Sequence, residues 1–134
     1  DGEKMSKSKN NMIGLFEDEE VLRKKIMSIK TDSKGVMDKK HSEEDNVFAY
    51  HKLFSRKMLD ELRDRYEQGG IGYKESKEIL LANMLRYTAG FRAKRAELEK
   101  DKDYVLGVLE DGAKRAAAKA DAKMAEVKEA IGVQ

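Results

Sequence analysis

From about residue 18 to the C-terminus, the apolar positions recur at steps of three and four, which is the period of α-helices and not of strands. Leu22, Ile26 and Ile29 predict a first helix over roughly 18–30. The acids of "EDEE" open it, at the end of a helix that favours negative charge. The polar stretch that follows, 31–42, predicts a loop.

Two short helices are predicted next. The second helix is marked by apolar and aromatic positions at Val47, Tyr50, His51 and Phe54. Ser55 is a candidate N-cap for the third helix, because a serine hydroxyl can accept from the first free backbone amides. The third helix carries Leu59, Leu62 and Tyr66 on one face. Gly69 and Gly70 predict its end.

The fourth and fifth helices are longer. The fourth, about 74–99, carries one stripe made of Leu80, Met84, Tyr87, Phe91 and Leu98. Tyr87 and Phe91 are predicted to fill the core, although exposed aromatic rings can also stack on bases. The fifth helix begins near Asp103 as its N-cap and is rich in alanine. Its small residues predict close antiparallel packing against the fourth helix.

The predicted fold is therefore all-α, a helical bundle of about five helices preceded by a flexible loop. A length of 134 residues suits one compact domain. Charged residues make up 40% of the chain and proline is absent, which favours amphipathic helices.

Composition excludes several kinds of chemistry. Cysteine is absent, so there is no disulfide, thiol nucleophile or thiolate metal site. The two histidines, His41 and His51, are too few and too far apart for a structural zinc site, and we predict no metal site. His51 lies on an apolar face and is expected to pack, with no catalytic role. No apolar run predicts a membrane span, and the expected location is the cytoplasm.

The first residues hold the strongest chemical signal. The string "KMSKS" occupies Lys4 to Ser8, and Gly2 precedes it. Lysine ammonium groups suit polyphosphate oxygens, and serine hydroxyls and free backbone amides add donors. A loop of this kind can close over a nucleotide and set its lysines against charge on a leaving pyrophosphate. On composition alone, a lysine and serine run is more often plain solvated surface.

The letters resolve that ambiguity, because "KMSKS" matches the signature loop of class I aminoacyl-tRNA synthetases at every position. The segment "VLRKKIMSIKTDSKG", the stretch "YEQGGIGYKESKEIL" and the tail "LEDGAKRAAAKA" resemble parts of tryptophanyl-tRNA synthetases. The chain departs from many bacterial members just after the loop, where Lys9, Asn10 and Asn11 replace a "DPN" run. The resemblance covers nearly the whole chain.

The resemblance implies a domain division and a reaction. Residues 1–16 would be the signature loop and the link from a catalytic nucleotide-binding domain, and 17–134 a helical C-terminal anticodon-binding domain. The intact enzyme would activate L-tryptophan with ATP and Mg²⁺, bound mostly by the other domain, and then charge tRNA(Trp), as a homodimer. The "HIGH" motif of the family is absent here, so we expect a C-terminal fragment that is inactive alone.

The resemblance also implies site residues. Lys4 and Lys7 are predicted to be catalytic, and the whole string is predicted to contact ATP: Lys4, Met5, Ser6, Lys7 and Ser8. Four basic residues of the fourth helix are candidates for tRNA phosphate contact: Arg86, Arg92, Lys94 and Arg95. Nearby acids can cancel much of that charge. Thr31, Asp32 and Ser33 either support the loop or only turn the chain.

Two alternatives remain open from sequence. One is a free-standing helical RNA-binding or interaction module in which the lysine loop is incidental. The other is the related tyrosine-tRNA ligase, which shares a loop of this type. The "TDS" segment and the alanine-rich tail favour tryptophan.

Overall fold

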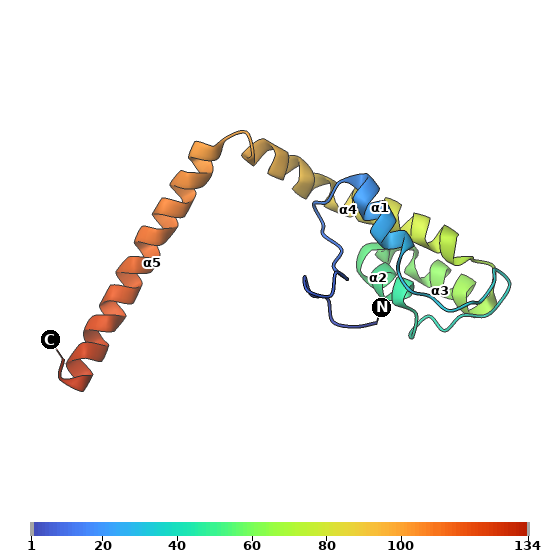
Figure 1. Cartoon of the computed structure of the whole chain (residues 1–134), viewed down its shortest axis with the longest axis horizontal. Coiled ribbons are helices and arrows are strands. Elements are labelled where there is room, and N and C mark those ends of the chain that lie inside the picture. The colour runs from blue at the N-terminus through green and yellow to red at the C-terminus, as the bar shows by residue number, and fades with distance from the viewer. Residues whose placement is uncertain (1, 134) are drawn as a thin grey trace. The chain divides into compact units, whose positions relative to one another are not determined.

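The computed structural model describes residues 2–133, and these contain helices and no strand (Figure 1). The helices are α1 (Glu19–Met27), α2 (Asn46–Phe54), a short 3-10 helix (Arg56–Met58), α3 (Leu59–Gln68), α4 (Tyr73–Leu98) and α5 (Lys102–Ile131). The prediction of an all-α fold with about five helices is confirmed. The chain divides into two compact units, one running to Arg92 and the other beginning at Ala93. The predicted functional boundary after residue 16 stays a prediction.

Two helix starts follow from aspartate caps. The Asp45 carboxylate accepts from the backbone amide of Phe48 at 2.8 Å and so opens α2. The Asp101 carboxylate accepts from the amide of Tyr104 at 3.0 Å and opens α5. The prediction of Asp103 as that cap was wrong, because Asp103 lies inside the first turn of the helix.

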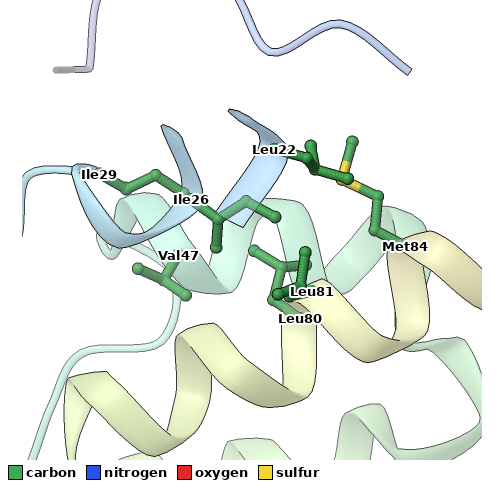
Figure 2. Close-up of a cluster of buried hydrophobic side chains, with 7 residues drawn as sticks. All are labelled: Leu22, Ile26, Ile29, Val47, Leu80, Leu81 and Met84. Carbon is green, nitrogen blue, oxygen red and sulfur yellow. The ribbon is translucent and has the colours of Figure 1, made fainter. Parts of the chain in front are cut away.

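The core of the first unit has two clusters. The first joins α1, α2 and α4 through Leu22, Ile26, Ile29, Val47, Leu80, Leu81 and Met84 (Figure 2). The second joins α2 and α3 through Phe48, Leu62, Tyr66 and Ile71. Most of these positions belong to the predicted apolar stripes, because a helical stripe becomes core wherever another helix covers it. The first cluster therefore holds α1 against α2 and α4.

Tyr87 and Phe91 correct one prediction. Both were expected to fill the core, yet each is 59% exposed. The cause is length: α4 has 26 residues and spans about 39 Å, whereas the helices that cover it, α1 and α2, have 9 residues each. The apolar stripe of α4 therefore extends past the part of the helix that α1 and α2 cover. Tyr87 instead packs edge to face with half-buried Phe54, with ring centres 5.5 Å apart, and lies tilted against Phe91 at 6.2 Å.

The second unit is dominated by α5. No residue of α5 is buried within this unit. The predicted packing of its alanine-rich face against the fourth helix stays a prediction. The exposed apolar side chains of α5 include Tyr104, Leu109, Met124 and Ile131.

A buried polar network lies between the two core clusters. His51 is fully buried, with Nδ1 2.7 Å from the Ser55 hydroxyl and Nε2 2.9 Å from the Ser76 hydroxyl. Tyr66 reaches Ser76 at 2.6 Å, and Asn83 Nδ2 donates to Ser55 at 2.9 Å. A neutral imidazole has one donor and one acceptor, so the two hydroxyls satisfy it. The prediction that His51 is a packing residue is confirmed.

Ser55 does not cap α3 with its side chain, as we had predicted. Its hydroxyl is taken by His51 and Asn83, and no side-chain cap bond is made at the 3-10 helix that follows it. The network therefore uses the serine to satisfy a buried ring, and the chain turns into α3 through the 3-10 helix. The predicted end of α3 at Gly69 and Gly70 is confirmed.

Burial lowers the pKa of His51 from its ordinary 6.5 to about 4. Between these values the unfolded chain binds more protons than the folded chain, so stability rises with pH across this window. We expect His51 to contribute about 3 kcal/mol to the free energy of unfolding above the unfolded-state pKa, and this contribution to be lost as pH falls through the folded-state pKa.

Urea unfolding at a series of pH values measures this effect. The matched control is His51→Gln, which keeps hydrogen-bonding groups and does not titrate in this range. Carboxylates contribute equally to both proteins, so the difference between the two curves isolates the histidine. Parallel curves would contradict the buried neutral imidazole.

Candidate functional site

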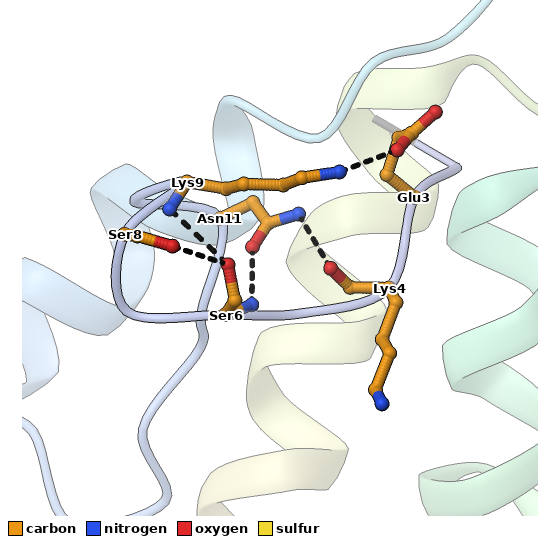
Figure 3. Close-up of polar contacts among 6 residues, drawn as sticks. All are labelled: Glu3, Lys4, Ser6, Ser8, Lys9 and Asn11. Carbon is orange, nitrogen blue, oxygen red and sulfur yellow. Dashed lines mark hydrogen bonds and ion pairs between the residues drawn. The ribbon is translucent and has the colours of Figure 1, made fainter.

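The signature loop, Lys4–Ser8, is held in shape by the residues that follow it (Figure 3). The Ser6 amide donates to the side-chain oxygen of Asn11 at 2.8 Å, and Asn11 Nδ2 donates back to the Lys4 carbonyl at 3.3 Å. The Ser6 hydroxyl accepts from the Lys9 amide at 3.2 Å and lies 3.2 Å from the Ser8 hydroxyl. Asn11 thus braces the loop from one side, a role that sequence reasoning missed.

A tight turn forms the far end of the loop. The Asn10 amide donates to the Lys7 carbonyl at 3.2 Å, and Asn10 adopts a left-handed conformation with φ of 50°. Asparagine tolerates this conformation better than most residues. Asn10 and Asn11 therefore give the loop its turn and its brace.

Lys4 and Lys7 are both exposed, and their ammonium groups have no partner among residues 2–133. Figure 3 shows the Lys4 side chain directed away from the braced residues. Lys9 differs, since its ammonium group lies 2.6 Å from a Glu3 carboxylate oxygen. The two lysines predicted to be catalytic are thus the ones whose charge is left available to an anion.

A cavity of about 510 Å³ lies beneath the loop. Its lining combines loop residues, including Met5 and Asn11, with Ile29, Tyr50 and Leu53 of the helical body. Neither Lys4 nor Lys7 lines it. The available ammonium groups and the cavity are therefore separate features.

The residues behind the loop are held by two cations. Lys25 donates to the Met12 carbonyl at 2.8 Å and to the Glu17 carboxylate at 2.5 Å. Arg92, from α4, donates from both terminal nitrogens to the Glu17 carbonyl. Sequence reasoning assigned no role to Lys25 and took Glu17 only as a helix-opening acid. No spacing rule connects these residues with Arg92.

The four basic residues predicted to contact tRNA all lie on α4, in different surroundings. Arg86 donates to Asn83 at 3.2 Å, and Arg92 is half-buried against Glu17. Lys94 and Arg95 are exposed and pair with nearby acids, Lys94 with Glu97 of α4 at 2.9 Å and Arg95 with Glu99, just past the end of α4, at 2.7 Å. Exposed pairs of this kind are weak and can exchange for a phosphate.

The "TDS" segment supports the helical body. Asp32 accepts from the Tyr73 hydroxyl at 2.7 Å and from the Lys34 amide at 3.0 Å. The Tyr73 hydrogen bond holds the pKa of Asp32 below its ordinary value. Lys77, almost fully buried, donates to the Met27 and Ile29 carbonyls at 3.0 and 2.7 Å and so closes the end of α1. These contacts support the structural interpretation of the segment.

Within residues 2–133, no cluster of three or more histidine, cysteine, aspartate or glutamate side chains offers a metal site. In the same part of the chain, no helix has both the length and the apolar character needed to cross a membrane.

A family model described as class I tRNA synthetases (W and Y) matches residues 1–87, which is more than half of the chain. The chain belongs to this family of class I tRNA synthetases. The match includes the signature loop, α1, α2, α3 and the first part of α4. The predicted resemblance to tryptophanyl-tRNA synthetases is also confirmed by individual relatives.

Among the relatives of this chain, the tryptophan-tRNA ligase of Fusobacterium nucleatum is 40% identical over 99% of the chain and 41% of its own length. The tryptophan-tRNA ligase of Rhodopirellula baltica is 43% identical over 87% of the chain and 37% of its own length. A crystal structure of tryptophanyl-tRNA synthetase from Campylobacter jejuni, complexed with ADP and tryptophan, superimposes with a TM-score of 0.85 at 40% identity. The superposition covers 99% of the present chain and 42% of the Campylobacter jejuni chain.

The chain thus spans about two fifths of the length of the synthetases that it matches. The shared part is the signature loop and the helices after it, with no strand among the described residues.

Proposed function

We propose that this chain is the C-terminal part of a tryptophan-tRNA ligase, which activates L-tryptophan with ATP and transfers it to tRNA(Trp). The observation that carries the proposal is the signature loop, in which Lys4 and Lys7 are exposed and have no partner among residues 2–133. It is supported by relatives named tryptophan-tRNA ligase at 40 to 43% identity. In this proposal ATP and its Mg²⁺ are held mostly by the catalytic domain, and no metal ligand is assigned here.

In the proposed reaction, the tryptophan carboxylate attacks the α-phosphorus of ATP, and pyrophosphate leaves. Lys4 and Lys7 face the departing phosphates, whose charge grows as the bond breaks, so their ammonium groups bind the transition state more strongly than the ground state. Met5, Ser6 and Ser8 complete the ATP contact. The hydroxyls of Ser6 and Ser8 lie 3.2 Å apart. We therefore propose that these hydroxyls keep the loop in shape, and that the two serines contact ATP through their backbone amides.

The helical body is proposed to bind the anticodon region of the tRNA. Lys94 and Arg95 are exposed, and their ion pairs with Glu97 and Glu99 are of a weak kind that a phosphate can replace. Arg86 and Arg92 contribute positive charge on the same helix, with their donors partly engaged. The proposal also places the full-length enzyme in the cytoplasm as a homodimer.

Tyrosine is the second candidate substrate, because the matching family model covers both the W and Y enzymes. The relatives described above favour tryptophan. A free-standing RNA-binding module has no comparable support.

The test is amino-acid-dependent exchange of pyrophosphate into ATP by the full-length polypeptide that carries this chain. We expect exchange with L-tryptophan and little with L-tyrosine. The 134-residue chain alone should show none, because its described residues contain no nucleotide-binding sheet. Exchange with tyrosine alone would assign the other substrate, and no exchange with either would contradict the proposed function.

A further inference from the structure

The base segment, residues 12–17, joins the signature loop to α1 and is held at both ends. At its start, Lys25 donates to the Met12 carbonyl at 2.8 Å. At its end, both terminal nitrogens of Arg92 donate to the Glu17 carbonyl. Ile13 packs against the first core cluster between these points. The segment is therefore fixed through its main chain by two charged side chains.

The two cations come from different parts of the body. Lys25 belongs to α1, close in sequence, whereas Arg92 lies 75 residues beyond Glu17 on α4. Lys25 also binds the Glu17 carboxylate at 2.5 Å, so Glu17 links both cations. Hydrogen bonds from a charged donor are stronger than neutral ones. The base segment is thus tied to both α1 and α4, the helices of the first core cluster.

Two unsatisfied atoms show that these contacts do more than fill space. Arg92 Nε and Glu17 Oε2 are buried and have no hydrogen-bond partner in the described part of the chain. One is a donor and the other an acceptor, and leaving such groups unpaired is costly. An apolar pair would avoid that cost. An apolar side chain could not donate to the Glu17 carbonyl, whereas Arg92 donates to it from both terminal nitrogens.

Gly14 makes this geometry possible. A Cβ on Gly14 would lie 2.9 Å from the Glu17 side chain, so any larger residue would push that side chain from its place beside Lys25. The glycine lets Glu17 fold back over the base segment.

We propose that Lys25 and Arg92 are positioning residues for the signature loop, fixing the base from which Lys4 and Lys7 reach the departing phosphates. This inference rests on the proposed function and deepens it. Lys4 and Lys7 have no partner among residues 2–133, so their position depends on how the loop is anchored. Neither Lys25 nor Arg92 touches ATP in this proposal. Displacement of a reacting group by about 1 Å can cost about a hundredfold in rate.

The experiment uses the full-length polypeptide with Arg92→Gln, Arg92→Lys and Lys25→Met. We expect Arg92→Gln and Lys25→Met to lower kcat for tryptophan-dependent pyrophosphate exchange about ten- to a hundredfold, with KM for tryptophan unchanged. Arg92→Lys should lose less, because an ammonium group can keep one bond to the Glu17 carbonyl. Amide hydrogen exchange of residues 4–11 should become faster in Arg92→Gln.

The controls remove similar contacts away from the loop. Arg23→Gln deletes the two-pronged pair with Glu78, at 2.7 Å, which joins α1 to α4, and Lys52→Met deletes the 2.6 Å pair with Glu43. Both should keep the wild-type kcat within about twofold. A thermal midpoint measured for every variant separates loss of fold from loss of position.

The outcomes separate the two proposals. Loss of kcat equal to that of the controls, or loop exchange unchanged in Arg92→Gln, would overturn the positioning role. A wild-type protein without tryptophan-dependent exchange would contradict the proposed function, and the hydrogen-exchange comparison would still decide whether Arg92 holds the loop.

Discussion

Lys7→Ala in the full-length enzyme is expected to slow tryptophanyl-adenylate formation by about a hundred- to a thousandfold. Removing one preorganised donor to charge that develops in a transition state has effects of this size. The Lys7 ammonium group has no partner among residues 2–133, so it is not already paired with a carboxylate. The affinity for tryptophan should change little, because this lysine is proposed to meet the phosphates and not the amino acid.

Single-turnover formation of the adenylate measures the chemical step directly, and KM for tryptophan is measured in parallel. Lys9→Ala is the matched control, since it removes the same charge from the neighbouring turn. Lys9 is paired with Glu3 at 2.6 Å, and only its backbone amide supports Ser6, which the alanine retains. We expect its rate to stay within a fewfold of wild type. Equal losses of rate for Lys7→Ala and Lys9→Ala would contradict a specific contact of Lys7 with the phosphates and would indicate that the loop contributes only its net positive charge.

The second large effect is expected at Gly69, where Gly69→Ala should lower the free energy of unfolding by about 3 to 5 kcal/mol. Gly69 ends α3 with φ of +88°, a conformation that side chains rarely adopt. A Cβ there would lie only 2.4 Å from the main-chain oxygen of Met37. That oxygen belongs to backbone that is itself fixed, because the neighbouring Val36 carbonyl accepts from the Gly70 amide at 2.8 Å.

Gly70→Ala separates the two causes. Gly70 also has a positive φ, of +107°, but a Cβ there would meet nothing within 4 Å. It should therefore cost about 1 to 3 kcal/mol from backbone strain alone. Urea unfolding of both variants gives the difference, which measures the clash with Met37. Equal losses would mean that the 31–42 loop yields freely, so that it does not brace the end of α3.

The sequence predicted the chemistry of the loop, but it did not predict the contacts that hold the loop in place. The string at Lys4 to Ser8 predicted a phosphate-facing loop from residue type and from resemblance. The brace by Asn11 depends on the chain turning back on itself at Asn10. The hold of Arg92 on Glu17 spans 75 residues, so no local pattern contains it. Arg92 was predicted to contact tRNA from its charge alone, and its hydrogen bonds to the Glu17 carbonyl could not be predicted from the sequence.

The sequence by itself determined the all-α class, the approximate limits of the helices and the buried face of each short one, from Leu22 and Ile26 to Leu62 and Tyr66. These follow from hydrophobic period, caps and glycines, which act within a few residues.

Tertiary structure alone decided how far each face is covered. It left Tyr87 and Phe91 exposed and brought Arg92 to the base of the loop. The physical reason is that a helical period specifies the direction in which a side chain points. Whether another element lies in that direction depends on the lengths and packing of helices that are distant in the chain.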